Sequence, residues 1–213
     1  MTSSFNPGHF KFLLDGAFWT LVLSLMAFVG GGLIGFAVAL ARISPLKTVR
    51  YLATGYVQLV QGTPLLVIMF VTYFGLPQLG ISVAPMVAAG LSMTIYVSAY
   101  LGEIWRGSIQ SVPKAQWEAA ECLALNRTER MFKVILPQAV RIAIPPTVGF
   151  SVQIVKNTSL AYVVGFVELT RAGQLINNSI FQPLPVYLSV AALYFCLCFP
   201  ISALSRRLEK RLA

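Results

Sequence analysis

The chain has 213 residues, of which 57% are hydrophobic and only 11% are charged. A soluble domain carries roughly 25% charged residues, so these charges are too few to cover a surface in contact with water. The mean hydropathy of +0.75 agrees with this, and the composition predicts an integral membrane protein. The net charge of +9 does not indicate nucleic-acid binding, because the basic residues lie in clusters between long apolar runs.

Five segments of the sequence are candidates for membrane spans, each of which needs about 20 apolar residues. The first four are strong, and they cover residues 18–41, 52–75, 83–102 and 183–205. Pro64 predicts a kink in the second of them. A weaker fifth segment, residues 142–155, contains Pro145 and Pro146 and is expected to be a broken span, followed by a short half-helix at 161–167. We therefore expect an all-α, polytopic protein with five transmembrane helices in a single domain, residues 1–213.

The distribution of basic residues predicts the orientation of these spans. Of the 16 basic residues, 13 fall between spans one and two, between spans three and four, or in the C-terminal tail. The positive-inside rule then places the N-terminus outside and the C-terminus in the cytoplasm of a multi-pass protein of the inner (cytoplasmic) membrane. The first span is longer than the apolar region of a signal peptide and basic residues follow it, which disfavours its cleavage.

The longest polar segment, residues 106–141, is expected to be a cytoplasmic loop that forms a helix, a corner and a second helix. Good helix formers fill residues 114–125. Asn126 is expected to cap the second helix, with Glu129 completing a capping box. Two interpretations remain open for the first helix. It is either an amphipathic helix that rests on lipid, or a docking element whose small alanines and larger Trp117 and Leu123 contact a cytoplasmic partner.

Several motifs of the chain resemble one family of membrane proteins. The loop segment 118–124, with the Ile135-Leu136-Pro137 that follows, resembles the EAA motif of permeases from binding-protein-dependent ABC importers. The polar amino-acid branch of that family, the histidine, glutamine and glutamate type, is similar over residues 12–212. The motifs that carry this similarity are Gln61-Gly62-Thr63-Pro64, Ala99-Tyr100-Leu101-Gly102-Glu103, Gly107-Ser108-Ile109-Gln110-Ser111 and Lys156-Asn157-Thr158-Ser159.

The sequence departs from the family pattern at three positions. Ala124 replaces the usual glycine after the EAA triplet, and this change keeps a small residue. Gln61 replaces the usual arginine before Gly-Thr-Pro, and Asn157 replaces an aspartate that is often found there. Because the last two changes remove charges, they concern the charge preference for the substrate rather than family membership.

The resemblance implies a type I ABC importer permease fold and a set of partners. Two permease chains, identical or paralogous, pair in the lipid membrane, ABC ATPase subunits dock on the EAA loops, and an external solute-binding protein delivers a polar amino acid. The expected docking residues are Glu118, Ala119, Ala120, Leu123 and Ala124. The sequence contains no phosphate-binding loop of the pattern G-x-x-x-x-G-K-[ST]. We therefore expect a transport subunit that is not an enzyme, with no cofactor, no metal and no nucleic-acid partner, and ATP hydrolysis in a separate chain.

Polar residues within the spans are few, and each is a candidate for the substrate path. The expected set comprises Gln61, Thr94, Ser98, Ser151, Gln153 and Asn157. For each single residue the alternative is a hydrogen bond between helices. Two other features have structural interpretations: an interfacial ion pair of Glu103 with Arg106, and close helix packing at Gly31 and Gly35.

Two alternative functions were weighed against the importer. An ion-coupled secondary amino-acid carrier would need inverted repeats and usually intramembrane acids. A membrane-embedded transferase would need clustered acids or histidines at one membrane face. Neither pattern is evident in the sequence.

Overall fold

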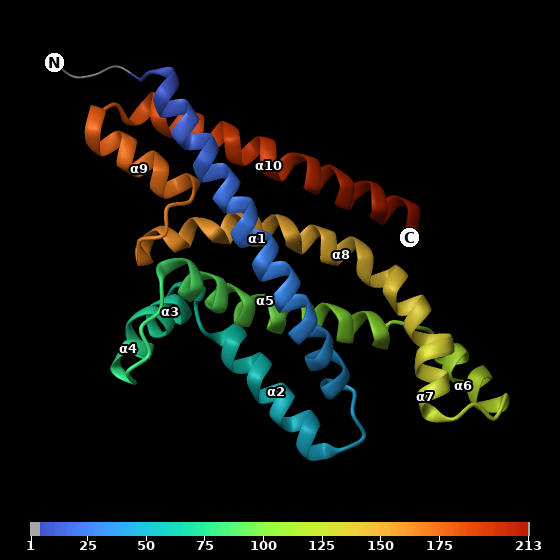
Figure 1. Cartoon of the computed structure of the whole chain (residues 1–213). Helices are drawn as coiled ribbons and strands as arrows, with labels where there is room; N and C mark the ends of the chain where they lie inside the picture. Colours follow the sequence, from blue (N-terminus) through green and yellow to red (C-terminus); the bar gives the residue numbers. More distant parts are fainter. Residues whose placement is uncertain (1–4, 213) are drawn as a thin grey trace.

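A computed structural model describes residues 5–212 of the chain, which form helices joined by short turns (Figure 1). Among these residues, four helices are long and apolar enough to cross a membrane, and a bent helix pair brings the number of spans to five if it forms one span. The all-helical fold with five candidate spans agrees with the sequence prediction.

Helix α1, Pro7–Arg42, lies across the other helices in Figure 1 and packs along α5, Pro85–Gln110. The two backbones approach closely because glycines line the contact. A Cβ atom at Gly31 would lie 2.5 Å from Cγ1 of Val97, and one at Gly35 would lie 2.9 Å from the carbonyl oxygen of Ser98. The predicted role of Gly31 and Gly35 in close helix packing is confirmed.

The second expected span is not one straight helix. Helix α2, Lys47–Gly62, is followed by α3, Leu65–Phe70, the π-helical segment η1, Val71–Gly75, and α4, Leu76–Gln78. The two parts are bent by 100°. Thr63, which precedes Pro64, is extended at φ −108° and ψ 128°, because the proline ring disfavours a helical conformation in the residue before it. The kink predicted at Pro64 is confirmed, and it divides the span over 52–75 into two helical segments at Thr63–Pro64.

Beyond the third span the chain forms the expected helix, corner and helix. Helix α5 continues to Gln110, so the polar loop begins later than residue 106, and α6, Lys114–Cys122, follows. The second helix begins with α7, Arg127–Glu129, and the π-helical segment η2, Arg130–Ile135. Asn126 Oδ1 accepts a hydrogen bond from the Glu129 backbone N–H (2.9 Å) and Glu129 Oε2 accepts one from the Asn126 backbone N–H (3.2 Å), which confirms the predicted capping box.

Helix α8, Leu136–Asn157, runs without a break through Pro145 and Pro146. The expected broken span at 142–155 is therefore wrong at this point. Neighbouring helices can supply hydrogen bonds to backbone groups near prolines in membrane helices. The two prolines remove the helical donors of the carbonyls at positions 141 and 142. The hydroxyl of Ser205 donates to a different carbonyl, that of Pro145, at 3.1 Å and so ties α8 to α10, Pro183–Leu212. Helix α8 is packed against both α5 and α10.

Between α8 and α10 lie a short 3-10 helix and a helix that the sequence did not predict. The 3-10 helix η3, Thr158–Val164, replaces the expected half-helix at 161–167 and ends at Gly165, whose φ is +85°. Helix α9, Leu169–Ile180, packs its apolar face on α1 and α10. Leu13, Leu169, Ile176 and Val186 form the centre of that contact.

Candidate functional site: a docking corner, an ion network and a polar helix face

The corner after α6 combines buried and exposed residues. Ala120 is 2% exposed and faces the chain itself, whereas Leu123 is 73% exposed. Glu118, Ala119 and Ala124 are also exposed. Of the five expected docking residues, four therefore have exposed side chains, and Ala120 is buried against the chain itself. We call the exposed set Glu118, Ala119, Leu123 and Ala124 the docking corner.

The turn of the docking corner is fixed by backbone geometry. Ala124 has a φ of 57°, in the left-handed region that commonly ends a helix. The Ala124 N–H donates to the Glu121 carbonyl at 2.9 Å, and the Leu125 N–H donates to the Ala120 carbonyl at 3.3 Å. An ion pair of 3.2 Å between Arg130 and Glu121 then joins the two arms of the hairpin. The corner is thus held in a fixed orientation relative to α8.

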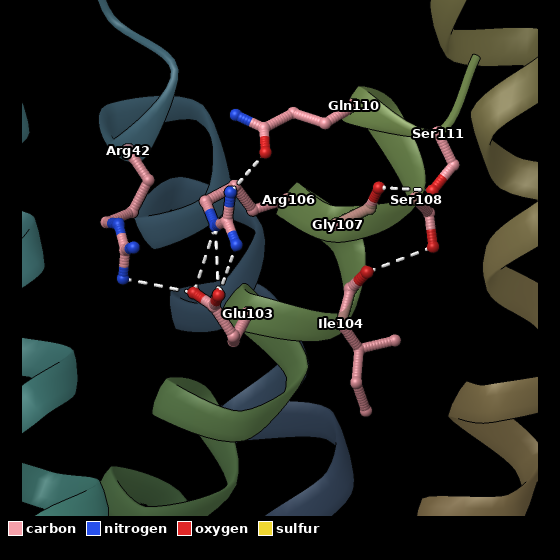
Figure 2. A network of polar contacts seen from close by, with 8 residues as sticks. All are labelled: Arg42, Glu103, Ile104, Arg106, Gly107, Ser108, Gln110 and Ser111. Atoms are coloured by element: carbon pink, nitrogen blue, oxygen red, sulfur yellow. Dashed lines mark hydrogen bonds and ion pairs between the residues drawn. The ribbon is translucent and has the colours of Figure 1, made fainter. Parts of the chain in front are cut away.

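A polar network joins the C-terminal end of α1 to the C-terminal part of α5 (Figure 2). Arg106 Nε donates to Glu103 Oε1 and Oε2 at 3.1 and 3.0 Å, so the predicted ion pair is confirmed. Figure 2 also shows two contacts that the sequence did not indicate, from Arg42 to Glu103 at 3.0 Å and from Arg106 to Gln110. Because Arg42 ends α1 and Gln110 ends α5, the network holds both helix ends together just before α6.

The expected substrate-path residues do not form one cluster. The Ser98 hydroxyl is fully buried, lies 2.6 Å from the Tyr56 hydroxyl, and donates to the Ile95 carbonyl at 2.8 Å. Thr94 faces α1 at Gly30, and the Ser151 hydroxyl donates to the Thr147 carbonyl at 3.1 Å. Of these contacts, only that between Ser98 and Tyr56 is a hydrogen bond between helices, the alternative interpretation, whereas the Ser151 bond lies within α8 and Thr94 packs against α1.

Two of the expected residues meet on one face of α8. The Gln153 side-chain amide donates to Asn157 Oδ1 at 2.9 Å, and Gln153 is exposed. Tyr96 of α5 lies beside Asn157, and Tyr96 and Tyr100 have ring centroids 4.5 Å apart. Sequence reasoning missed these tyrosines, although their spacing of four residues places them on one face of α5. Gln61 lies apart from α8 in sequence, in the last turn of α2 and directly before the break at Pro64.

Glu168 is a buried acidic residue to which sequence reasoning assigned no role. It is 0% exposed and caps α9: its carboxylate accepts hydrogen bonds from the backbone N–H groups of Thr170 and Arg171 and from the Tyr194 hydroxyl, each at 2.8 Å. It lies outside the helices long enough to span a membrane, and burial raises the pKa of its carboxyl. Its position just before an amphipathic segment was the available signal for a helix cap.

Within residues 5–212, no group of three or more histidine, cysteine or acidic side chains is placed to hold a metal ion. An apolar hollow of about 320 Å³ lies between α1, α5 and α8. The polar groups at its wall, Trp105 Nε1 and Thr147 Oγ1, are hydrogen-bonded to each other at 2.9 Å. This hollow therefore has no polar group directed at a ligand.

The helices form a polytopic membrane protein with a bent second span, a capped hairpin between α5 and α8, and a polar face on α8. Residues 31–213 match the family of binding-protein-dependent transport system inner membrane components. The chain belongs to this family, whose members are transport components rather than enzymes.

Known relatives extend over nearly the whole chain. It is 39% identical over 204 residues to the probable glutamine ABC transporter permease protein GlnM of Bacillus subtilis (strain 168), covering 96% of this chain and 94% of the relative. It is 36% identical over 201 residues to the L-cystine transport system permease protein TcyB of the same organism, covering 94% and 86%. A crystal structure of an amino acid ABC transporter with histidines contains a chain that is 32% identical, with a TM-score of 0.90 and 94% of each chain covered.

Proposed function

We propose that this chain is the permease subunit of an ATP-driven importer for polar amino acids. Family membership supports a transport role, and the relatives named for glutamine and L-cystine support an amino-acid substrate. In this proposal, two permease chains, identical or paralogous, form the path, and an external solute-binding protein supplies the amino acid. The secondary carrier and the transferase are not favoured by these relatives.

The docking corner carries the proposal that ATPase subunits bind on the cytoplasmic side. Leu123 exposes an apolar side chain at the tip of a fixed hairpin, and Ala119 and Ala124 allow a partner backbone to approach. Burial of an apolar side chain at the centre of an interface contributes to binding, and small neighbouring residues let the partner surface pack closely against it. The ion network of Arg42, Glu103 and Arg106 then links movement of this corner to α1 and α5.

The substrate path in this proposal runs past the polar face of α8. Gln153 and Asn157 offer amide donors and acceptors that suit a zwitterion, and Gln61 lies at the break of the second span, where interrupted helices commonly contribute to substrate sites. Ser98 joins α5 to α2 through Tyr56, Thr94 packs against α1, and Ser151 is hydrogen-bonded within α8.

The docking proposal is tested by Leu123→Glu, with Thr48→Glu as the matched control at an exposed position of α2. The permease and the ATPase encoded beside its gene are co-expressed and purified through a tag on the permease. We expect Leu123→Glu to weaken ATPase binding about 30-fold or more, because removing a hot spot costs about 2 kcal/mol or more. Equal ATPase recovery with both variants would instead mean that α6 rests on lipid.

A further inference from the structure

Basic side chains gather where α8 begins and α10 ends. Arg141 lies in the second turn of α8 and is exposed. The last turns of α10 hold one acid, Glu209, and four exposed cations: Arg206, Arg207, Lys210 and Arg211. The ion pairs among residues 5–212 involve none of these side chains. Arg141 and the end of α10 therefore both carry positive charge that the described part of the chain does not neutralise.

The two basic segments lie at the same end of a packed helix pair. Ser205 of α10 donates to the Pro145 carbonyl of α8 at 3.1 Å, and a Cβ atom at Gly149 would lie 3.2 Å from the Ser205 hydroxyl oxygen. The helices α8 and α10 lie side by side and run in opposite directions (Figure 1). From the Ser205 contact, α8 therefore leads back to Arg141 over one turn while α10 leads forward into its basic end.

An apolar hollow lies beside Arg141 on the surface of α8. The hollow has a volume of about 320 Å³, and Ile144 and Val148 of α8 are among the residues that line it. Residues three, four and seven positions apart share a helix face, so Arg141 is on the same face as Ile144, Pro145 and Val148. At roughly 100° per residue, Arg141 lies between the strip of α8 that lines the hollow and the strip that contacts α10.

The hollow suits a hydrocarbon chain. Apolar side chains of α1, α5 and α8 make up most of its wall, and its two polar groups, Trp105 and Thr147, are hydrogen-bonded to each other at 2.9 Å. A polar ligand would need polar groups placed to orient it. The three helices are each long and apolar enough to cross a membrane, and lipid chains are the abundant apolar molecules at that depth.

We propose that this region binds one anionic phospholipid, with its phosphate on Arg141 and the basic end of α10 and one acyl chain in the hollow. Clusters of basic residues next to a membrane span commonly bind anionic lipid headgroups. Long basic side chains at helix ends extend along apolar surface to reach them. The hollow beside Arg141 distinguishes a site for one lipid from general attraction by charge. The inference goes beyond the proposed transport function and does not depend on which amino acid is carried.

The experiment measures lipid binding to the purified chain in a neutral detergent, after its native lipids have been removed. The chain is titrated with dioleoyl phosphatidylglycerol, which is anionic, or with dioleoyl phosphatidylcholine, which has the same acyl chains and no net charge. Native mass spectrometry counts the bound lipids and gives the affinities. Glycerol 1-phosphate, added as a competitor, tests a phosphate that carries no acyl chains.

The variants separate the charge from the hollow. Arg141→Gln removes one cation, and Lys47→Gln is the matched control at the exposed cation that begins α2. Ala143 lines the hollow, so Ala143→Phe fills part of it. Ala192→Phe is the control for that change at an exposed position of α10.

We expect wild type to bind phosphatidylglycerol about tenfold or more tightly than phosphatidylcholine, because each cation near a lipid headgroup contributes about fivefold. Arg141→Gln should lower the affinity for phosphatidylglycerol about fivefold and leave that for phosphatidylcholine unchanged. Ala143→Phe should lower both affinities about tenfold, since excluding two methylenes from an apolar site has an effect of that size. Both controls should bind like wild type. If Ala143→Phe does not fold, Ala143→Leu is expected to show the same loss to a smaller extent.

Several results would overturn the inference. Equal affinity of wild type for the two lipids would do so, as would an equal loss in Arg141→Gln and Lys47→Gln, which indicates attraction by net charge alone. If glycerol 1-phosphate displaces phosphatidylglycerol at similar concentrations, the cations bind phosphate without a lipid chain. If Ala143→Phe leaves lipid binding unchanged and separates paired permease chains, a second copy of the chain covers the hollow.

Discussion

At residue 124 the backbone is left-handed, with a φ of 57°. An L-residue with a Cβ atom pays roughly 1–2 kcal/mol for this conformation, and glycine does not. The sequence departs from the family glycine at this position, and a small side chain was expected to preserve docking. The structure adds a conformational reason for the glycine that the family usually has at this position. The turn that exposes Leu123 requires the left-handed backbone conformation, which glycine adopts without strain.

Ala124→Gly is therefore expected to raise the free energy of unfolding by about 1 kcal/mol. Ala119→Gly is the matched control, since the same change inside helix α6 should lower it by about 1 kcal/mol. Thermal unfolding of both purified variants, followed by intrinsic fluorescence, checks the prediction. A decrease of the same size in both variants would contradict the left-handed turn.

Asn157 is the residue at which side-chain preference is expected to change. Its amide offers donors and acceptors, whereas an aspartate offers only acceptors. We expect Asn157→Asp to shift the uptake preference toward lysine and arginine. We expect Asn157→Leu to lower the uptake of all the amino acids tested. Each change should alter the apparent free energy of substrate binding by about 1–3 kcal/mol. Competition uptake with a constant binding protein measures both. Ser159→Ala serves as the control, because the Ser159 hydroxyl of η3 is already bonded to the Lys156 carbonyl in the last turn of α8. An unchanged profile and rate in both variants would leave Asn157 with a structural role.

At the scale of elements, the contact between α1 and α5 depends on backbone proximity. A Cβ atom at Gly31 would meet Cγ1 of Val97 at 2.5 Å, but one at Gly55 in α2 would meet nothing within 4 Å. The same substitution should therefore have opposite effects at the two positions, because overpacking competes with the higher helix propensity of alanine.

We expect Gly31→Ala to lower the free energy of unfolding by about 1–3 kcal/mol and Gly55→Ala to leave it unchanged or raise it by up to about 1 kcal/mol. Denaturant titration in mixed micelles, with helicity as the signal, compares the two variants. Stabilisation by Gly31→Ala would show that α1 is not seated against α5 as described.

At the scale of the whole molecule, the distribution of basic residues predicts how the chain is oriented in the membrane. With 13 of 16 basic residues assigned to one side, α6 is expected in the cytoplasm and α9 outside. In a background without cysteines at 122, 196 and 198, single cysteines are placed at Gln116 and Asn178, which are both exposed.

An impermeant thiol reagent applied to intact cells should then label Asn178→Cys and not Gln116→Cys. Both should react after the cells are opened, which controls for accessibility. Labelling of Gln116→Cys in intact cells would reverse the orientation and remove the docking corner from the ATPase side.

Local signals predicted many of the elements correctly. The capping box at Asn126 and Glu129, the ion pair of Glu103 with Arg106, and the glycine contact of α1 all follow from residues a few positions apart in sequence. The polar helix face was found in part, since Gln153 and Asn157 are one helical turn apart. Arg42, Tyr96 and Tyr194 were missed because their partners come from other helices.

The sequence by itself determined that the protein lies in a membrane, that its fold is all-α, where its spans approximately lie and which family motifs it contains. These features depend on hydropathy and on the spacing of residues close together in the sequence. The sequence also predicted the kink at Pro64, but only the tertiary structure decided how large that bend is and that Pro145 and Pro146 do not break their helix. Thr63–Pro64 breaks its span by 100°, while Pro145 and Pro146 stay inside a helix. The rings impose similar local restrictions in both places. α8 remains continuous where it packs on α5 and α10, and Ser205 donates to the Pro145 carbonyl. The hydrogen bond between Ser205 and Pro145 joins residues 60 positions apart, and no local sequence pattern indicates such a contact.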